Sequence, residues 1–185
     1  ILKSQKNKIL SDEEIGYISK IIDQEVSLFT LSVGVMVNTG CSLSEIVGLS
    51  KSDINLNQYA PYIIIRDNNL RKIYNIYKKR TIPLVGISLN SMQVLLRSST
   101  SEFPFQDFIE KGFELKKIEN KINFKLKKLI KKTHHSFRVT LIERLKMINC
   151  PEEIISEILG IKSRNIFYNN QISIEMKLSW LNQII

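Results

Sequence analysis

The sequence predicts an α+β protein that is mostly helical and has a small three-stranded antiparallel sheet in the middle of the chain. Three observations support this fold class: helical spacing of apolar residues over the first 60 positions, a β-branched run from Tyr62, and a return to helical spacing after Gly86. The chain has 185 residues, of which 43% are hydrophobic, so it is long enough to bury a real core. It shows no internal repeat or linker, so one domain over residues 1–185 accounts for the whole chain.

The N-terminal part is predicted to be helical because its apolar residues recur at helical spacing between start and stop signals. The expected helices cover about 12–26, about 28–38 and a short segment through Leu49. Ser11 opens the first helix with a capping box and three acids in the first turn. Gly40 is placed to end the second helix in a left-handed conformation, and Ser42 or Ser44 can cap the third.

The middle of the chain changes to a β pattern. Tyr62–Arg66 is a β-branched run, and the Asp-Asn-Asn turn at 67–69 tolerates a left-handed backbone. Residues 70–76 are predicted to form the return strand, and Arg80–Leu84 the third strand. Pro83 lacks a backbone N–H, which places that third strand at an edge of the sheet.

After Gly86 the spacing of apolar residues is helical again. The predicted helices cover about 88–98, 115–132, 135–147, 151–159 and 173–184. Pro151, followed by two glutamates, is a well-formed helix start. The last helix can belong to the core or can be an arm exchanged with a neighbouring protomer. Self-association through this helix is therefore a hypothesis.

Basic residues outnumber acidic ones, 27 to 18, which leaves a formal net charge of +9. Residues 66–97 hold seven basic residues and one acid, and residues 121–138 hold seven basic residues and no acid. Such blocks predict a face that binds the phosphates of double-stranded DNA, although a basic surface can also serve solubility alone. The lysines at 121–132 can alternatively form the solvated face of an amphipathic helix. The candidate DNA-binding residues are Lys78, Lys79, Arg80, Lys128, Lys131 and Lys132.

The sequence argues against a disulfide framework, a metal cluster and a membrane role. Its two cysteines, Cys41 and Cys150, have no CxxC spacing and are expected to be reduced core thiols of a cytosolic protein. The longest apolar run, Leu28–Val37, is far shorter than the roughly 20 residues that span a bilayer, and no signal peptide is visible. Because the chain begins at Ile1 without an initiator Met, we expect it to be part of a longer protein.

Four short segments form an ordered set along the chain. They are the T-G-C-S-L-S-E-I-V-G-L string at 39–49, R-T-I-P-L at 80–84, H-S-F-R at 135–138 and L-G at 159–160. In this order and spacing they resemble the catalytic domain of the tyrosine recombinase (phage integrase) family. The resemblance covers about residues 12–184 and implies the fold of that domain, including its three-stranded sheet. An RNA-binding or protein-binding helical domain would require all four matches to be coincidental.

The resemblance implies site-specific DNA recombination, that is integration and excision, by a phage or genomic-island integrase. In this family a tyrosine hydroxyl attacks a DNA phosphodiester and becomes joined to the 3′ phosphate, while the 5′ hydroxyl leaves. Two arginines hold the non-bridging oxygens, and a lysine and histidines transfer protons or donate hydrogen bonds, without a metal or another cofactor. The resemblance also implies a cytoplasmic, bacterial or phage-encoded protein that acts at the nucleoid, whose N-terminal DNA-binding domain is missing from this chain.

Transferred to this sequence, the active site of the family keeps three of its residues. Arg138 occupies the second arginine position, His135 the neighbouring histidine position, and Tyr168 the nucleophile position, counted back from Trp180. Without the resemblance, these residues have ordinary explanations. They would be a capping or core histidine, an arginine paired with Glu143, and a packing aromatic.

Three other positions depart from the pattern of the family. Ser42 stands in place of the first arginine, Tyr74 in place of the sheet lysine, and Ile161 in place of the third-site histidine or tryptophan. Losing one such donor typically costs a factor on the order of 10² to 10³ in rate. Lys72, two residues from Tyr74 on the predicted strand and so on the same face, is a candidate substitute acid. The sequence leaves two hypotheses: a recombinase that acts through Tyr168, or a catalytically inactive remnant that only binds DNA.

Overall fold

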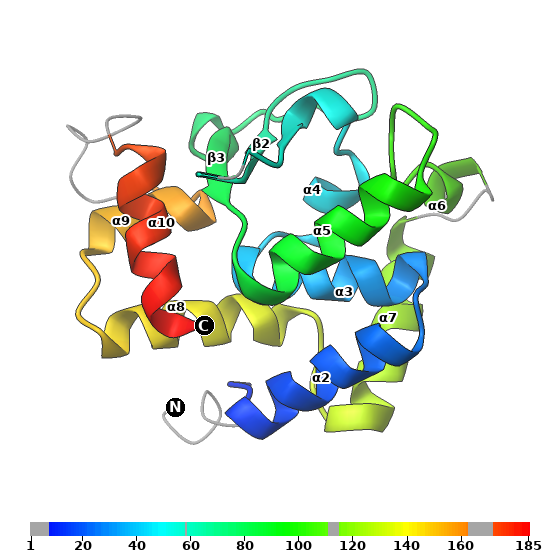
Figure 1. Cartoon of the computed structure of the whole chain (residues 1–185), viewed down its shortest axis with the longest axis horizontal. Coiled ribbons are helices and arrows are strands. Elements are labelled where there is room, and N and C mark those ends of the chain that lie inside the picture. Colours follow the sequence, from blue (N-terminus) through cyan, green and yellow to red (C-terminus); the bar gives the residue numbers. More distant parts are fainter. Residues whose placement is uncertain (1–7, 58, 111–114, 163–171) are drawn as a thin grey trace.

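The structure is a computed structural model that describes residues 8–57, 59–110, 115–162 and 172–185 (Figure 1). Its helices are α2 (Asp12–Gln24), α3 (Leu28–Thr39), α4 (Leu43–Val47), α5 (Gly86–Ser98), α6 (Asp107–Glu110), α7 (Leu115–Ile130), α8 (His135–Met147), α9 (Glu152–Leu159) and α10 (Ile174–Leu181). Its strands are β1 (Ile54–Asn55), β2 (Tyr62–Ile65) and β3 (Arg80–Pro83). Short 3-10 turns lie at η1 (Lys51–Asp53), η2 (Ile76–Lys78) and η4 (Asn182–Ile184). The predicted fold class, mostly helical α+β, is confirmed.

As predicted, the sheet is three-stranded and antiparallel, and its strand order is β1-β2-β3. Ile63 on the central strand pairs with Ile54 on one side and with Ile82 on the other. Alternate residues of β2 are buried and half-buried, so one face of the sheet covers the core. Pro83 lies on β3, which is an edge strand, the position that its missing N–H predicts.

One predicted strand is wrong, because residues 70–76 form no strand. The sheet instead contains β1, which precedes the two other strands in the sequence. The turn residues organise this segment as a loop through their side chains. Asp67 Oδ1 accepts a hydrogen bond from the backbone N–H of Ile73 at 2.6 Å, and Asn68 Oδ1 accepts one from Leu70 at 3.0 Å. Bonds between side chains and nearby backbone compete with a strand ladder, which explains why a β-like sequence does not pair here.

The predicted helices are confirmed, with shifts of a few residues at their ends. Among the described helices, α6 was not predicted. Ser11 Oγ accepts from the Glu14 N–H at 3.2 Å while Glu14 Oε2 accepts from the Ser11 N–H at 2.8 Å, which completes the capping box. Gly40 ends α3 with a φ of 61°. Of the two candidate caps for α4, Ser42 is the one that accepts from the Glu45 N–H. None of the described helices has the length and hydropathy needed to cross a bilayer.

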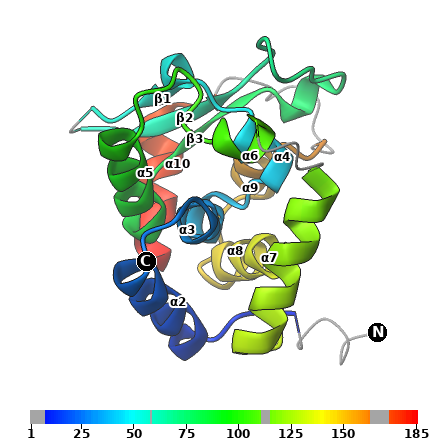
Figure 2. The ribbon, with the colours of Figure 1, turned by 90° about the vertical axis from the view of Figure 1, so that its right-hand side faces the viewer.

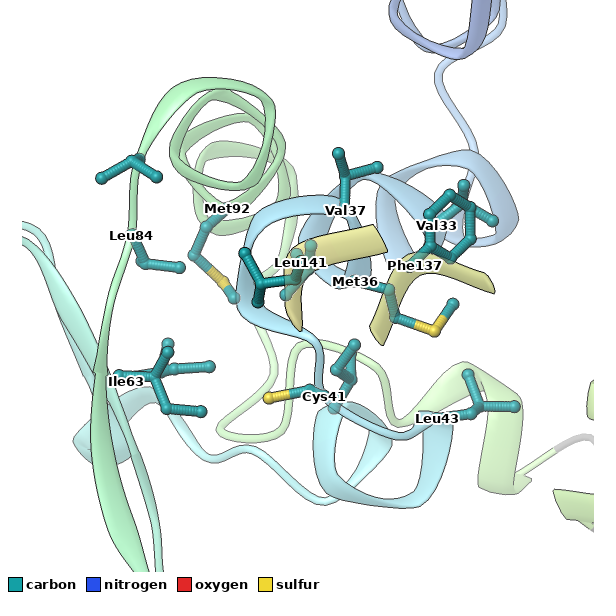
Figure 3. Close-up of a cluster of buried hydrophobic side chains, with 14 of the residues drawn as sticks. Val33, Met36, Val37, Cys41, Leu43, Ile63, Leu84, Met92, Phe137 and Leu141 are labelled. Atoms are coloured by element: carbon teal, nitrogen blue, oxygen red, sulfur yellow. The ribbon is translucent and has the colours of Figure 1, made fainter. Parts of the chain in front are cut away.

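The core is built around α3, whose residues 30–39 are all buried. Figure 2 shows α3 nearly end-on, with α2, α5, α7 and α8 around it and the sheet at one end. Side chains from α3, α5, α8 and the sheet meet in one apolar cluster (Figure 3). Cys41 and Cys150 are buried and free, as predicted. Burial raises the pKa of each thiol to about 11, so both are protonated at neutral pH.

The C-terminal helix α10 packs on its own chain. Leu181 has no exposed surface, and Lys177 is only 5% exposed. Lys177 Nζ lies 2.8 Å from Glu157 Oε2 on α9 and donates to Thr81 O on β3 at 3.4 Å. In the structure this helix belongs to the core of its own chain. Self-association stays a hypothesis.

The close crossing of α3 and α5 depends on Gly34. A Cβ atom at this position would lie 2.9 Å from Ser91 Cβ and would overlap Ser91 Oγ. We therefore expect Gly34→Ala to lower the free energy of unfolding by about 1–3 kcal/mol, measured by denaturant unfolding, because the two helices must move apart. The double variant Gly34→Ala/Ser91→Gly should recover part of this loss. A double variant that is no more stable than Gly34→Ala would contradict the close approach.

Candidate active site

The candidate site lies where the C-terminal ends of α3 and α9 meet the first turn of α8. Arg138 on that turn joins the two ends: its Nη1 donates to Gly40 O at 3.1 Å and its Nη2 to Leu159 O at 2.6 Å. Carbonyls at a helix C-terminus lack intrahelical partners and carry partial negative charge, so a guanidinium is a suitable donor to them. The backbone of two other elements therefore holds Arg138 in place.

Two left-handed glycines let these ends come together. Gly40 has a φ of 61°, and a Cβ atom there would lie 2.7 Å from Leu159 Cδ2. Gly160 has a φ of 65°, and a Cβ atom there would lie 2.8 Å from Arg80 Nη1. Only glycine combines this backbone conformation with room for the neighbouring side chain. The T-G and L-G strings of the sequence thus have a direct role in shaping the site.

Arg138 retains donors for a ligand. Its side chain is partly buried, and burial and the nearby Arg80 lower the pKa of its guanidinium, but an arginine keeps its charge in a protein. The two hydrogen bonds to carbonyls use two of its five N–H groups, which leaves three. The alternative pairing with Glu143 is not formed, because Glu143 Oε1 instead lies 3.5 Å from Lys146 Nζ. Arg138 can therefore hold the oxygens of a phosphate.

Two adjacent histidines at the start of α8 have different environments. His134 is buried; its backbone N–H donates to Asn123 Oδ1 at 3.0 Å, and its Nδ1 lies 2.8 Å from the same oxygen. Burial and the neighbouring His135 lower the pKa of His134, so this ring is neutral at pH 7. His135 is exposed, with its ring centroid 4.0 Å from that of His134. Of the two histidines, His134 is the buried one. His135 is exposed and lies three positions before Arg138, on the same face of α8.

Ser42, which the sequence predicts at the first arginine position, caps its own helix. The Ser42 N–H donates to Glu45 Oε2 at 2.8 Å, and Ser42 Oγ accepts from the Glu45 N–H at 3.4 Å. Arg80 binds the same carboxylate, with Nη1 2.6 Å from Oε1. Burial acts to raise the pKa of Glu45, but the hydrogen bond and the charge of Arg80, together with Ser42, lower it. This position therefore holds a satisfied carboxylate and offers no positive charge to a ligand.

Arg80 differs from the other candidate DNA-binding residues. It is 7% exposed, and besides binding Glu45 it donates to Ile158 O at 2.9 Å and to Lys78 O at 2.8 Å. Its charge is used inside the protein, where it joins β3 to α4 and α9. The other five candidates are exposed or partly exposed: Lys78, Lys79, Lys128, Lys131 and Lys132.

The remaining predicted site residues lie in three places. Tyr74, whose side chain is 98% exposed, and Lys72, also exposed, are on the loop between β2 and β3. No strand forms there, so the prediction that Lys72 and Tyr74 share a strand face is wrong. Both residues nevertheless line a cavity of about 270 Å³ that Ser42 also lines. Ile161 follows α9 and is 42% exposed. Tyr168 lies outside the described residues.

Sequence reasoning missed two residues that support this site. Arg71 is 9% exposed; its Nη1 donates to Glu45 O at 2.5 Å, and its Nη2 lies 3.5 Å from Asp53 Oδ2. Arg71 lies in a basic stretch of the sequence, which could have indicated a functional residue. Because residues 70–76 were predicted to form a strand, the inward position of Arg71 was not predicted. Asn123 had no signal, because its partner His134 becomes a neighbour only through the packing of α7 on α8. In the described part of the chain, no three His, Cys, Asp or Glu side chains gather to hold a metal ion.

The described helices and sheet have the fold of solved transposon integrase structures, the fold that the ordered segments predicted. No protein-family model matches the sequence, and no curated protein matches it either. Among solved structures, the chain is similar to the Tn1549 transposon integrase in complex with transposon right end DNA, with a TM-score of 0.61 and 15% identity. Two complexes of this integrase with circular intermediate DNA give TM-scores of 0.56 and 0.58 at 15% and 14% identity. Each similarity covers 93% of this chain, and this chain spans about 60% of the integrase chains.

Proposed function

We propose that this chain is a DNA-binding domain of the tyrosine recombinase type that holds a DNA phosphate at Arg138 but does not cleave the strand. Arg138 supports this function, because it has three N–H groups left for a ligand and shares a helix face with the exposed His135, three positions before it. The net charge of +9 favours a polyanionic partner. The similar Tn1549 integrase structures are complexes with DNA. The parent protein would be an integrase of a phage or another mobile element, acting in a bacterial cytoplasm.

The loss of strand cleavage rests on Ser42. A neutral hydroxyl bound to Glu45 stands where the family has an arginine, and the neighbouring cation Arg80 is fully engaged inside the protein. The side chain of Ile161 cannot donate a hydrogen bond at the third-site position. Because each missing donor costs a factor on the order of 10² to 10³ in rate, the combined loss is expected to suppress turnover. The alternative, an active recombinase, needs substitutes for all of these groups.

A nicked DNA duplex separates the two hypotheses. The wild-type protein is expected to shift the duplex in a native gel, with an affinity that falls as salt rises, and to leave no covalent adduct in a denaturing gel. An adduct that disappears in Tyr168→Phe would establish recombinase chemistry and overturn the inactive half of the proposal. Absence of binding at low salt would overturn the DNA-binding half. An adduct formed by Ser42→Arg but not by the wild type would support the proposal that the protein does not cleave DNA because it lacks this arginine.

Lys131 offers a test in which stability and DNA binding should move in opposite directions. It ends α7 with a φ of 58°, a left-handed conformation that costs a lysine about 1 kcal/mol relative to glycine. Lys131→Gly is therefore expected to raise the free energy of unfolding by about 0.5–1 kcal/mol. If Lys131 contacts a phosphate, the same variant reduces the slope of log affinity against log salt by about 0.9.

Thermal unfolding and fluorescence anisotropy at several salt concentrations measure these two effects. The charge-matched control is Lys146→Ala, because Lys146 lies in the last turn of α8, at the opposite end of that helix from the site. The control is expected to keep the wild-type slope. A slope for Lys131→Gly that equals the wild-type slope would remove Lys131 from the DNA-binding surface.

A further inference from the structure

A cavity of about 270 Å³ lies beside Ser42, between the start of α4 and the loop that connects β2 to β3. Ser42 and Ser44 line one wall, and Arg71, Lys72 and Lys78 line the other. Ser42 is a small residue whose hydroxyl turns back to cap α4, so its side chain occupies little of this space. It is near the lower end of the volumes that small ligands occupy.

The lining of this cavity is positively charged. It includes three cations and one acid, Glu45, whose charge is balanced by Arg80 at 2.6 Å. Lys72 and Lys78 are exposed, and neither forms a salt bridge with a described residue. Arg71 is a buried cation whose Nη2 has no hydrogen-bond partner in the described structure and lies 3.5 Å from Asp53 Oδ2, an acid that also pairs with Arg66. An anion entering the cavity would therefore meet the charges of Lys72 and Lys78, which no acidic residue of the described structure pairs.

The basic wall is held in its shape without a ligand. Asp67 accepts from the Ile73 N–H at 2.6 Å through one oxygen and from Lys79 Nζ at 2.6 Å through the other. The Asn68 side-chain amide donates to Gly48 O at 2.7 Å, which ties the loop to the end of α4. Because these bonds fix the loop in advance, little ordering cost is expected when a ligand binds.

We propose that this cavity binds a second backbone phosphate of DNA, in addition to the phosphate at Arg138, with Lys72 and Lys78 supplying unpaired charge and Arg71 adding to the positive field. The ammonium groups of the two lysines and the hydroxyls of Ser42 and Ser44 are donors to the phosphate oxygens, and Arg71 contributes charge from behind the wall. The positive charge of this part of the site has thus moved from α4 to the facing loop. This inference rests on the proposed DNA binding and adds a second phosphate contact to it.

A pair of serine substitutions with the same change in net charge tests the cavity. Ser44→Glu places a carboxylate in it, whereas Ser98→Glu places one on an exposed serine at the end of α5. Binding of a labelled duplex at low salt is expected to weaken about tenfold or more in Ser44→Glu and less than about twofold in Ser98→Glu. The double variant Lys72→Ala/Lys78→Ala should reduce the salt slope by about 0.9 for each phosphate contact that is lost.

Titration with inorganic phosphate, followed by NMR, keeps the cavity testable if the duplex does not bind. Phosphate is expected to shift the backbone amide signals of Ser44 and Lys72 in the wild type but not in Ser44→Glu. If Ser44→Glu and Ser98→Glu bind the duplex equally well, the second phosphate contact is wrong. The proposed function still holds in that case, provided that Arg138→Ala weakens binding. Shifts with phosphate but no duplex binding would retain an anion site and overturn DNA as its ligand. No shifts and no duplex binding would overturn both.

Discussion

Replacing Glu45 by alanine is expected to lower the free energy of unfolding by about 3–5 kcal/mol, because it breaks a buried ion pair. The variant leaves the guanidinium of Arg80, which is 7% exposed, without the carboxylate that lies 2.6 Å away. It also removes the acceptor for the Ser42 N–H and so half of the capping box of α4. Denaturant unfolding monitored by circular dichroism measures the loss. A loss below about 1 kcal/mol would contradict a structural role for this pair.

Glu45→Gln is the matched control for this variant. Glutamine keeps the shape and an acceptor oxygen but loses the charge, so its expected loss is smaller, about 2 kcal/mol. A loss as large as that of Glu45→Ala would mean that the charge, and not the shape or the remaining acceptor, accounts for the effect.

The stabilisation by Glu45 should also depend on pH. The pKa of Glu45 in the folded protein is lowered from its ordinary value of 4.5, so its stabilisation is present above that ordinary pKa and is lost as pH falls through the lowered one. The difference in stability between the wild type and Glu45→Ala should therefore be constant near neutral pH and shrink in acid. A difference that stays constant well below the ordinary pKa would show that the carboxylate charge contributes nothing.

Arg138→Ala is expected to weaken DNA binding by about 10- to 100-fold, because a hydrogen-bonded guanidinium–phosphate contact contributes about 1.5–3 kcal/mol. Fluorescence anisotropy with a labelled duplex at one fixed salt concentration measures the change. The variant also leaves Gly40 O and Leu159 O without their donor, so its folding has to be verified by circular dichroism. Arg138→Lys keeps the charge but lacks the planar fork, and an intermediate loss is expected for it.

The control for Arg138 is Arg97→Ala. Arg97 is exposed in the last turn of α5 and carries the same charge, so its removal should change DNA affinity by less than about twofold. Equal losses of DNA affinity in Arg97→Ala and Arg138→Ala would mean that Arg138 contributes only non-specific positive charge. The proposal that Arg138 holds a phosphate would then be wrong.

Features set by neighbouring residues could be predicted from the sequence. The Ser11 capping box and the left-handed Gly40 depend on contacts within a few positions, and both are present as predicted. The ordered short segments predicted the fold, and the structural similarity confirms it. The positions of Arg138 and His135 on the first turn of α8 also follow from the sequence, because α8 begins where it was predicted.

Features set by contacts between distant elements could not be predicted. The loop at 70–76 has a β-like sequence, but Asn68 bonds to Gly48 O and Arg71 to Glu45 O, which lie 20 and 26 residues away in the sequence. Arg80 stands in a basic turn and was a candidate for DNA, yet Glu45, 35 residues away, holds it inside the protein. The difference between His134 and His135 likewise depends on Asn123 of α7.

The sequence by itself determined the fold and the order of the short segments, because these depend on residue identity and local spacing, and it predicts a serine, Ser42, at the position of the first arginine. The tertiary structure alone decided which of the basic residues have charge left for a ligand. The guanidinium of Arg80 pairs with Glu45 and donates to two carbonyls. The guanidinium of Arg138 donates to two carbonyls, so three of its five N–H groups remain for a ligand. The reason is physical: a buried cation must find acceptors, and the acceptors here come from segments that only folding brings together.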